Sequence, residues 1–313
     1  IDLAIGMLFL SLTTVGFVGN FSLLYHYLFL SYTGCRLRHT DLILNHLTIA
    51  NSLVLLTKAV PQTMAAFGLK HFFNDVKCHL LHYVQRVGRS VSIGTTCLLS
   101  VFQAITISPM NSRWKDLKVK APKYVGVSIS FCWILNFVVN VFVPVYGLYV
   151  SGKWVNKTIT KKRYLRHCSV ADNENISGLV YTALIAFPEV SFSVLIIWAS
   201  ASMIFILYRH KQRVQHIHRT SISPRVCPES RATKSILVLV STFVSFYTLS
   251  SLFHASVALF HDHSLWLVNI NDLISVCFPT VSPFLVVTRD LTESNLCFIW
   301  VRNKTSPKLI RNV

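Results

Sequence analysis

The sequence predicts an all-α membrane protein, a bundle of seven transmembrane helices whose N-terminus is extracellular. Hydrophobic residues make up 52% of the 313 residues and charged residues only 13%, which is about half the charged fraction of a soluble domain. Seven apolar stretches are each long enough to cross about 30 Å of hydrocarbon. We place these spans at residues 4–30, 42–67, 79–108, 124–150, 177–208, 234–260 and 266–288.

The spans form one domain, residues 1–288, followed by a cytoplasmic tail, residues 289–313. The segments after the first, third, fifth and seventh spans carry more than twice as many Lys and Arg residues as the other loops. Cytoplasmic loops are enriched in these residues. The bias therefore predicts an extracellular N-terminus, a cytoplasmic C-terminus and a multi-pass protein of the plasma membrane. The basic cluster at 161–166, in the longest outer loop, is the one feature that opposes this orientation.

The net charge of +18 could also indicate a nucleic-acid-binding protein. We reject nucleic acid as a partner because the basic residues flank the spans, where membrane topology places them. Membrane lipids are the expected partners of this charge, since the cytoplasmic leaflet is anionic.

The stretch Ser90–Pro109 predicts the central helix of the bundle. Small residues occupy its outer half, and bulkier Leu, Val and Phe residues occupy its inner half. Small residues allow close approach of neighbouring helices in a membrane. Arg86 and Arg89 precede this stretch by one turn and lie about 12 and 16 Å along the helix from Cys78.

Ionisable residues inside the spans are the main candidates for a site. A charged side chain in the membrane is unfavourable by about 2.5–3.5 kcal/mol on insertion scales and usually faces the bundle interior or a wet cavity. All of them fall in the middle or outer half of the bundle, so we predict a ligand pocket open to the outside. Structural ion pairs between helices are the alternative. The candidate ligand-binding residues are Lys58, Arg86, Arg89, Glu189 and Asp272.

The outer loops carry candidate modification sites. Three of the eight cysteines lie within spans and three on the cytoplasmic side, which leaves Cys78 and Cys168 in the oxidising compartment. Disulfides persist there, so we predict that these two pair. Asn156 and Asn175 begin Asn-X-Ser/Thr sequons in the long outer loop and are candidates for glycosylation.

The cytoplasmic side carries a basic loop between the fifth and sixth spans. It begins with the string RHKQRVQHIHRTSISPR at residues 209–225. We interpret it as a docking surface for a cytosolic partner, and attraction to anionic lipids is an alternative that can hold together with it.

Several strings carry a family resemblance that extends over nearly the whole chain. They are HLTIANS at residues 46–52, SIGTTCLLSVFQAITISP at 92–109, the basic loop, and ATKSILVLVSTFVSFYTLSS at 232–251. With a cysteine at the head of the third span, they resemble the vomeronasal type-1 receptors, pheromone receptors of the G-protein-coupled class. The resemblance implies detection of small-molecule chemosignals and coupling to a heterotrimeric G protein of the inhibitory type.

Some positions depart from rhodopsin-like receptors in a way that the vomeronasal family shares. Asn51 occupies the place of their second-span aspartate, which puts sodium binding in doubt, and Ser282 precedes Pro283 where they have asparagine. A bitter-taste-like or other chemosensory receptor is the nearest alternative, and a small-solute transporter is a more distant one. Transporters often contain two related halves, and no such repeat is visible. We expect no enzymatic activity, no cofactor and no metal site, because no paired His and carboxylate motif occurs in the spans.

Overall fold

The computed structural model describes residues 2–33, 38–67, 75–108, 115–154, 162–165, 168–171, 176–217, 237–250 and 269–287. The elements in chain order are α1 (Asp2–Tyr32), α2 (His39–Val54), a π-helical turn η1 (Leu55–Ala59), α3 (Val60–Ala66), α4 (Asp75–Ile107), α5 (Lys115–Trp154), β1 (Lys162–Leu165), β2 (Cys168–Ala171) and α6 (Ile176–Ile217). Two further helices, Leu237–Ser250 and Asn269–Val287, follow α6.

The helices confirm a multi-pass membrane protein. Within the described residues, five helices are long and apolar enough to cross a membrane, and they cover Ala4–Tyr32, His39–Met64, His79–Ile107, Asp116–Val141 and Asn269–Val287. Shorter apolar helical stretches occur at Val190–Ile206, within α6, and at Leu237–Ser250. The count of seven spans and the orientation of the N-terminus stay predictions.

Helices α5 and α6 extend beyond the spans that hydropathy predicts. Helix α5 begins at Lys115 rather than at residue 124, and α6 continues to Ile217 rather than ending at residue 208. The added turns are rich in Lys, Arg and Gln, which are good helix formers but poor membrane residues. Hydropathy therefore locates the apolar part of these helices and misses their polar ends.

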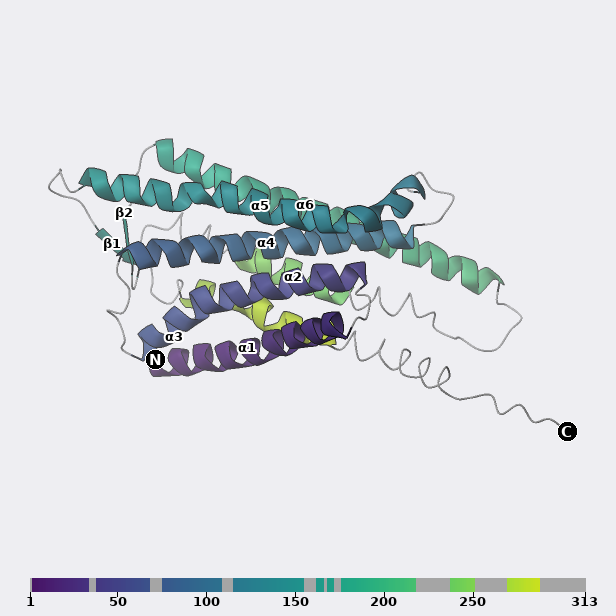
Figure 1. The fold of residues 1–313 in the computed structure, drawn as a ribbon, viewed down its shortest axis with the longest axis horizontal. Helices are drawn as coiled ribbons and strands as arrows, with labels where there is room; N and C mark the ends of the chain where they lie inside the picture. Colours follow the sequence, from purple (N-terminus) through teal and green to yellow (C-terminus); the bar gives the residue numbers. More distant parts are fainter. Residues whose placement is uncertain are drawn as a thin grey trace.

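The bundle is helical, as predicted, and the segment between α5 and α6 contains two short strands that hydropathy did not predict. Strands β1 and β2 form an antiparallel pair in which Lys162 faces Ala171 and Leu165 faces Cys168. The basic cluster that opposed the predicted orientation thus lies partly in a strand. Strand β2 contacts both α4 and α5, and the sheet lies at the same end of the bundle as the start of α4 (Figure 1).

Helix α4 is the centre of the bundle, as the sequence predicted for Ser90–Pro109. It contacts α2, α5 and α6 and lies between them in Figure 1. In the most apolar segment of α4, 67% is buried inside the structure, whereas in that of α5 only 28% is buried. Large apolar side chains cover the outer surfaces of α1, α5 and α6, as lipid-facing helices require.

Small and hydroxylated residues allow α4 to occupy this central position. A methyl group added to Gly94 would overlap Cys132 Sγ on α5. Thr95, Thr96 and Ser100 have no exposed surface, and their hydroxyls donate to carbonyls one turn earlier at 2.7–2.8 Å. Such bonds satisfy polar groups where no water is available.

The helix Asn269–Val287 is joined to α1 through a proline. Pro283 has no N–H, so the carbonyl of Pro279, four residues earlier, lacks its helical donor. Asn20 Nδ2 donates to that carbonyl at 2.9 Å. The Pro283 ring also lies where a side chain on Gly19 would be. The side-chain amide of Asn20 therefore gives the Pro279 carbonyl the hydrogen bond that Pro283 cannot donate.

Candidate functional site

Lys58 and Asp272 form an ion pair inside the bundle. Lys58 Nζ lies 3.0 Å from Asp272 Oδ1, and the two side chains are 8% and 14% exposed. Gln62 Nε2 donates to the other carboxylate oxygen, Oδ2, at 2.6 Å. Both oxygens of Asp272 are thus engaged by groups from the second membrane helix. The arrangement matches the alternative reading of these two charges, a structural ion pair between helices.

The backbone around Lys58 departs from a regular α-helix. Residues Leu55–Ala59 form a π-helical turn, and Pro61 follows after Val60. Because Pro61 has no N–H, the carbonyl of Thr57 loses its usual helical donor. π-Helical turns inside α-helices are frequent at functional sites. Here the turn carries the buried lysine that meets Asp272.

Two hydrogen bonds centred on Asn51 join three helices separately from this ion pair. Asn51 Nδ2 donates to Ser282 Oγ at 2.8 Å, and Ser92 Oγ donates to Asn51 Oδ1 at 2.9 Å. All three side chains are buried. Each partner is a neutral amide or hydroxyl, so the structure places an uncharged hydrogen-bonded cluster at Asn51.

Arg86 and Arg89 share α4 but reach different neighbours. Arg86 Nε donates to Asn140 Oδ1 on α5 at 3.4 Å. Arg89 Nη1 donates to Ser250 Oγ at 3.2 Å, and its guanidinium carbon lies 5.0 Å from the centre of the Tyr247 ring. Ser250 and Tyr247 belong to the helix Leu237–Ser250. The two arginines therefore donate these hydrogen bonds to two different helices.

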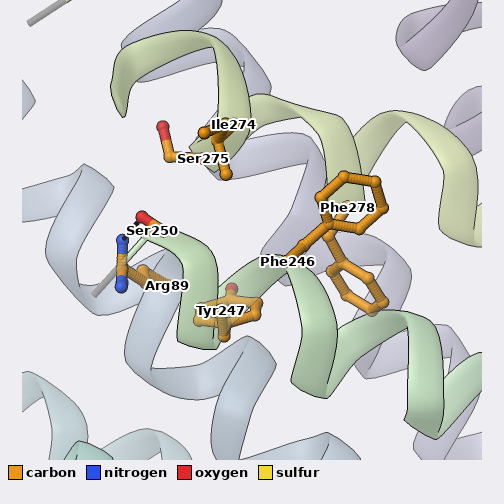
Figure 2. Close-up of a pocket in the computed structure, with 7 residues that line it drawn as sticks. All are labelled: Arg89, Phe246, Tyr247, Ser250, Ile274, Ser275 and Phe278. Carbon is orange, nitrogen blue, oxygen red and sulfur yellow. Dashed lines mark hydrogen bonds between the residues drawn. The ribbon is translucent and has the colours of Figure 1, made fainter. Parts of the chain in front are cut away.

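A cavity lies beside Arg89. Its volume is about 10 Å³, and its walls come from α4 and the helices Leu237–Ser250 and Asn269–Val287. Figure 2 shows Arg89 beside Ser250 and Tyr247, with Phe246 and Phe278 grouped away from the guanidinium. One side of the cavity is polar and the other aromatic. Its lining residues are Arg89, Phe246, Tyr247, Ser250, Ile274, Ser275 and Phe278.

Stacked aromatic rings hold the Tyr247 face toward Arg89. Phe243 stacks on Tyr247 with ring centres 4.1 Å apart. Phe278 meets Phe243 edge-on at 4.8 Å and Tyr247 at 5.9 Å. Edge-to-face and offset-stacked geometries are the favourable ones for aromatic pairs. The helices Leu237–Ser250 and Asn269–Val287 are thus joined by rings directly beside the cavity.

The predicted site residues separate into groups. Arg89 lines the cavity, Lys58 and Asp272 pair with each other, and Arg86 binds α5. Glu189 lies on α6, and its side chain is outside the described part of the structure. Among the described residues, no three His, Cys, Asp or Glu side chains converge in a manner that would hold a metal ion.

The predicted modification sites fall at the edge of the described structure. Cys78 lies in the first turns of α4, and Cys168 is the first residue of β2; their side chains are outside the described part. Asn156 and Asn175 lie outside the described residues. The contact between β2 and α4 is compatible with the predicted disulfide, which stays a prediction.

Sequence reasoning missed the uncharged half of the site. Gln62, Tyr247 and Ser250 contact the predicted charges, but polar and aromatic residues of these kinds occur throughout the spans. A weak signal was available for Gln62, which lies four residues after Lys58 and directly after Pro61. For Tyr247 and Ser250 the sequence contains no signal that separates them from neighbouring Ser and Phe residues.

Comparison with known proteins covers nearly the whole chain. Residues 3–299 match the model of the vomeronasal organ pheromone receptor family. Human vomeronasal type-1 receptor 4 is 54% identical over 299 residues, which are 96% of this chain and 98% of the relative. Human vomeronasal type-1 receptor 3 is 50% identical over 312 residues, 99% of each chain.

A third relative, human vomeronasal type-1 receptor 2, is 53% identical over 288 residues, 92% of this chain and 72% of its own. Matches of this length and identity, together with the membrane helices, confirm the resemblance seen in the sequence strings. The chain belongs to the vomeronasal organ pheromone receptor family, a family of G-protein-coupled receptors that cross the membrane several times.

Proposed function

We propose that this chain is a chemosensory receptor that binds small chemosignals in an outward-facing pocket and activates a G protein of the inhibitory type. The observation that carries the proposal is the family match over residues 3–299. Arg89 supports it, because an ionisable residue inside a span usually faces the bundle interior and marks a functional site, and Arg89 borders a small cavity between three helices.

The proposed topology has seven spans, an extracellular N-terminus and a cytoplasmic C-terminus in the plasma membrane. The bias of Lys and Arg toward alternate loops supports it, and so do the shorter apolar helices at Val190–Ile206 and Leu237–Ser250. In this topology Asn156 and Asn175 face the lumen during synthesis. Enzymatic removal of N-glycans should shift the electrophoretic mobility of the receptor, and the variant Asn156→Gln/Asn175→Gln should show no shift. A persistent shift in the double variant would contradict the assignment.

The proposed mechanism is a shift between two helix arrangements. The cavity walls come from three helices, so a ligand that contacts them better in one arrangement favours that arrangement. Movement of α6 and the helix Leu237–Ser250 would open the inner face. The basic end of α6, which includes Arg209 and continues to Ile217, is the expected start of the surface for the G protein.

We assign the roles of four of the five candidate residues by their contacts, and that of Glu189 by its charge and its place on α6. Arg89 contacts the ligand, because it lines the cavity. Lys58 and Asp272 join the second membrane helix to the helix Asn269–Val287, which forms one wall of the cavity. Arg86 orients α4 against α5 through Asn140, and Glu189 contributes charge from α6.

The test is guanine-nucleotide exchange in membranes that contain the receptor and a purified inhibitory G protein, with a panel of volatile and polar compounds. We expect compound-dependent exchange in the receptor and loss of potency in Arg89→Gln. Lys77→Gln is a control for a compound response, because Lys77 is an exposed cation on α4, about three turns before Arg89 and away from the cavity. Exchange on another class of G protein with silence on the inhibitory class would overturn the proposed coupling.

A further inference from the structure

We propose that the start of α5 binds a membrane lipid with a phosphomonoester headgroup, with the phosphate on Lys120 and Lys123 and the acyl chains along the exposed face of the same helix. The inference goes beyond the proposed function, because it concerns neither the cavity nor the G protein. It depends on the proposed topology only for the leaflet that supplies the lipid. Three observations carry it: two available lysines, an apolar surface that continues from them, and the charge that they can neutralise.

The start of α5 concentrates positive charge at one end of the bundle. Lysine occurs at positions 115, 118, 120 and 123, and Asp116 is the one acidic residue in this segment. The segment lies at the opposite end of the bundle from β1 and β2 (Figure 1), which is the cytoplasmic end in the proposed topology. Groups of about four to eight basic residues beside a span, on the cytoplasmic side, are typical of binding to anionic lipid headgroups.

Two of these lysines are available to a ligand. Lys118 Nζ donates to the Ser108 carbonyl at 3.1 Å, which holds the start of α5 against the end of α4. Lys120 and Lys123 are exposed, and within the described part of the chain neither forms an ion pair or a hydrogen bond. Lys118 therefore fixes the position of the segment, and Lys120 and Lys123 can bind another molecule.

The face of α5 that carries these lysines continues as an apolar surface. Lys123, Val127 and Phe131 follow one another at intervals of four residues, and Lys120 and Tyr124 share that interval. Residues three or four apart lie on one face of a helix. Tyr124, Val127 and Phe131 are 59%, 66% and 63% exposed. Tyrosine is enriched at the level of the headgroups, and the two apolar side chains beyond it offer contacts to acyl chains.

The charge of the two lysines selects the kind of headgroup. Both ammonium groups can reach one phosphate, because side chains three residues apart on a helix have Cβ atoms about 5–6 Å apart. A phosphomonoester carries about −1.5 to −2 elementary charges near pH 7, which two lysines neutralise, whereas a phosphodiester carries less. Asp116 precedes Lys120 by one turn and lies about 6 Å farther from the apolar part of α5, so water and salt screen its repulsion for a bound phosphate. The pair therefore favours a phosphoinositide over a lipid that has only a phosphodiester.

The experiment measures lipid binding directly, without a chemosignal or a G protein. Full-length receptor in detergent micelles is titrated with phosphatidylinositol 4-phosphate, phosphatidylinositol, phosphatidylserine and the free headgroup inositol 1,4-bisphosphate, and bound molecules are counted by native mass spectrometry. The first two lipids differ only in the phosphomonoester. We expect phosphatidylinositol 4-phosphate to bind at least tenfold more tightly than either phosphodiester lipid. The free headgroup should bind at least tenfold more weakly than the lipid, because it has no acyl chains to contact Val127 and Phe131.

Variants connect the preference to α5. Lys120→Gln/Lys123→Gln should weaken binding of phosphatidylinositol 4-phosphate about tenfold or more and change binding of phosphatidylinositol less than threefold. Lys120→Gln alone should weaken the first about threefold or more, whereas Lys77→Gln, a matched exposed lysine on α4 at the other end of the bundle, should leave it unchanged. Asp116→Asn removes the neighbouring negative charge and should tighten binding about twofold. This opposite change keeps the proposal testable if the double lysine variant does not fold.

Three results would overturn the proposal. They are equal affinity for phosphatidylinositol 4-phosphate and either phosphodiester lipid, equal affinity for the lipid and its free headgroup, and unchanged lipid binding by folded Lys120→Gln/Lys123→Gln. Each is distinguishable from failure of the proposed function, because nucleotide exchange driven by a compound would leave the receptor assignment in place.

Discussion

Two cations inside the same bundle are stabilised in different ways. Lys58 has a carboxylate oxygen of Asp272 at 3.0 Å and is 8% exposed, and the amide of Gln62 holds the other oxygen. Arg89 lies against the Ser250 hydroxyl and over the Tyr247 ring, and it borders a cavity. The first region joins two helices through opposite charges. The second places a cation beside a small cavity between three helices.

The comparison shows that a charged residue inside the bundle can either join two helices or stay compatible with a further partner. An ion pair with both partners buried fixes the distance between its helices, because either charge alone is unfavourable in the interior. An aromatic face stabilises a guanidinium by less, about 0.5–2 kcal/mol, and its geometry is compatible with a further partner. The proposed division of roles is therefore helix joining by Lys58 and Asp272, and ligand contact by Arg89.

Breaking the ion pair should have the largest effect on stability. Asp272→Asn leaves Lys58 as a buried charge beside two amides, and loss of one partner from a buried pair costs about 3–5 kcal/mol. Thermal unfolding in nanodiscs should show the loss. The double variant Lys58→Met/Asp272→Leu should recover most of it, since apolar residues of similar volume replace such pairs well.

The same variants sharpen the comparison between the two regions. If Asp272 acts only in joining helices, folded Asp272→Asn should respond to an activating compound in the nucleotide-exchange assay with a potency within threefold of that of the parent receptor. A tenfold loss of potency without a loss of stability would place Asp272 in direct contact with the ligand and would contradict the division of roles.

A smaller effect is expected where Asn20 meets the helix that carries Asp272 and part of the cavity wall. Asn20→Ala leaves the Pro279 carbonyl buried without its donor from α1, which costs about 1–3 kcal/mol. Pro283→Ala supplies a backbone N–H to that carbonyl. The destabilisation by Asn20→Ala, measured by thermal unfolding, should therefore be smaller in the Pro283→Ala background. An equal loss in both backgrounds would show that the proline is not the reason for the contact.

The smallest effect on stability is expected from loss of the Tyr247 ring, which contacts Arg89. Tyr247→Leu removes the cation–π contact and should lower stability by about 1 kcal/mol more than Tyr247→Phe, which keeps the ring. Unfolding midpoints of the two variants give the comparison, and Tyr25→Leu, an exposed tyrosine on α1, serves as a control for loss of a ring. Equal midpoints for Tyr247→Leu and Tyr247→Phe would mean that the ring contributes little to holding Arg89.

Much of the fold was predictable because a membrane-spanning helix must be apolar and long enough to cross the hydrocarbon. Apolar runs located the helices, and small residues in Ser90–Pro109 identified the central one, since only small side chains allow neighbours as close as Cys132 comes to Gly94. The strands β1 and β2 were not predicted, because a segment of mixed polar residues carries no clear period. The π-helical turn at Leu55–Ala59 also has no hydropathy signal.

By itself, the sequence determined the family, the membrane class and the short set of charges that require partners, because ionisable groups in apolar spans are rare and costly. Only the tertiary structure decided which charge meets which partner. Arg86 and Arg89 are three residues apart on one helix, yet one reaches Asn140 on α5 and the other reaches Ser250. The physical reason is that pairing depends on distances between helices far apart in the chain, and a linear pattern of residues does not contain those distances.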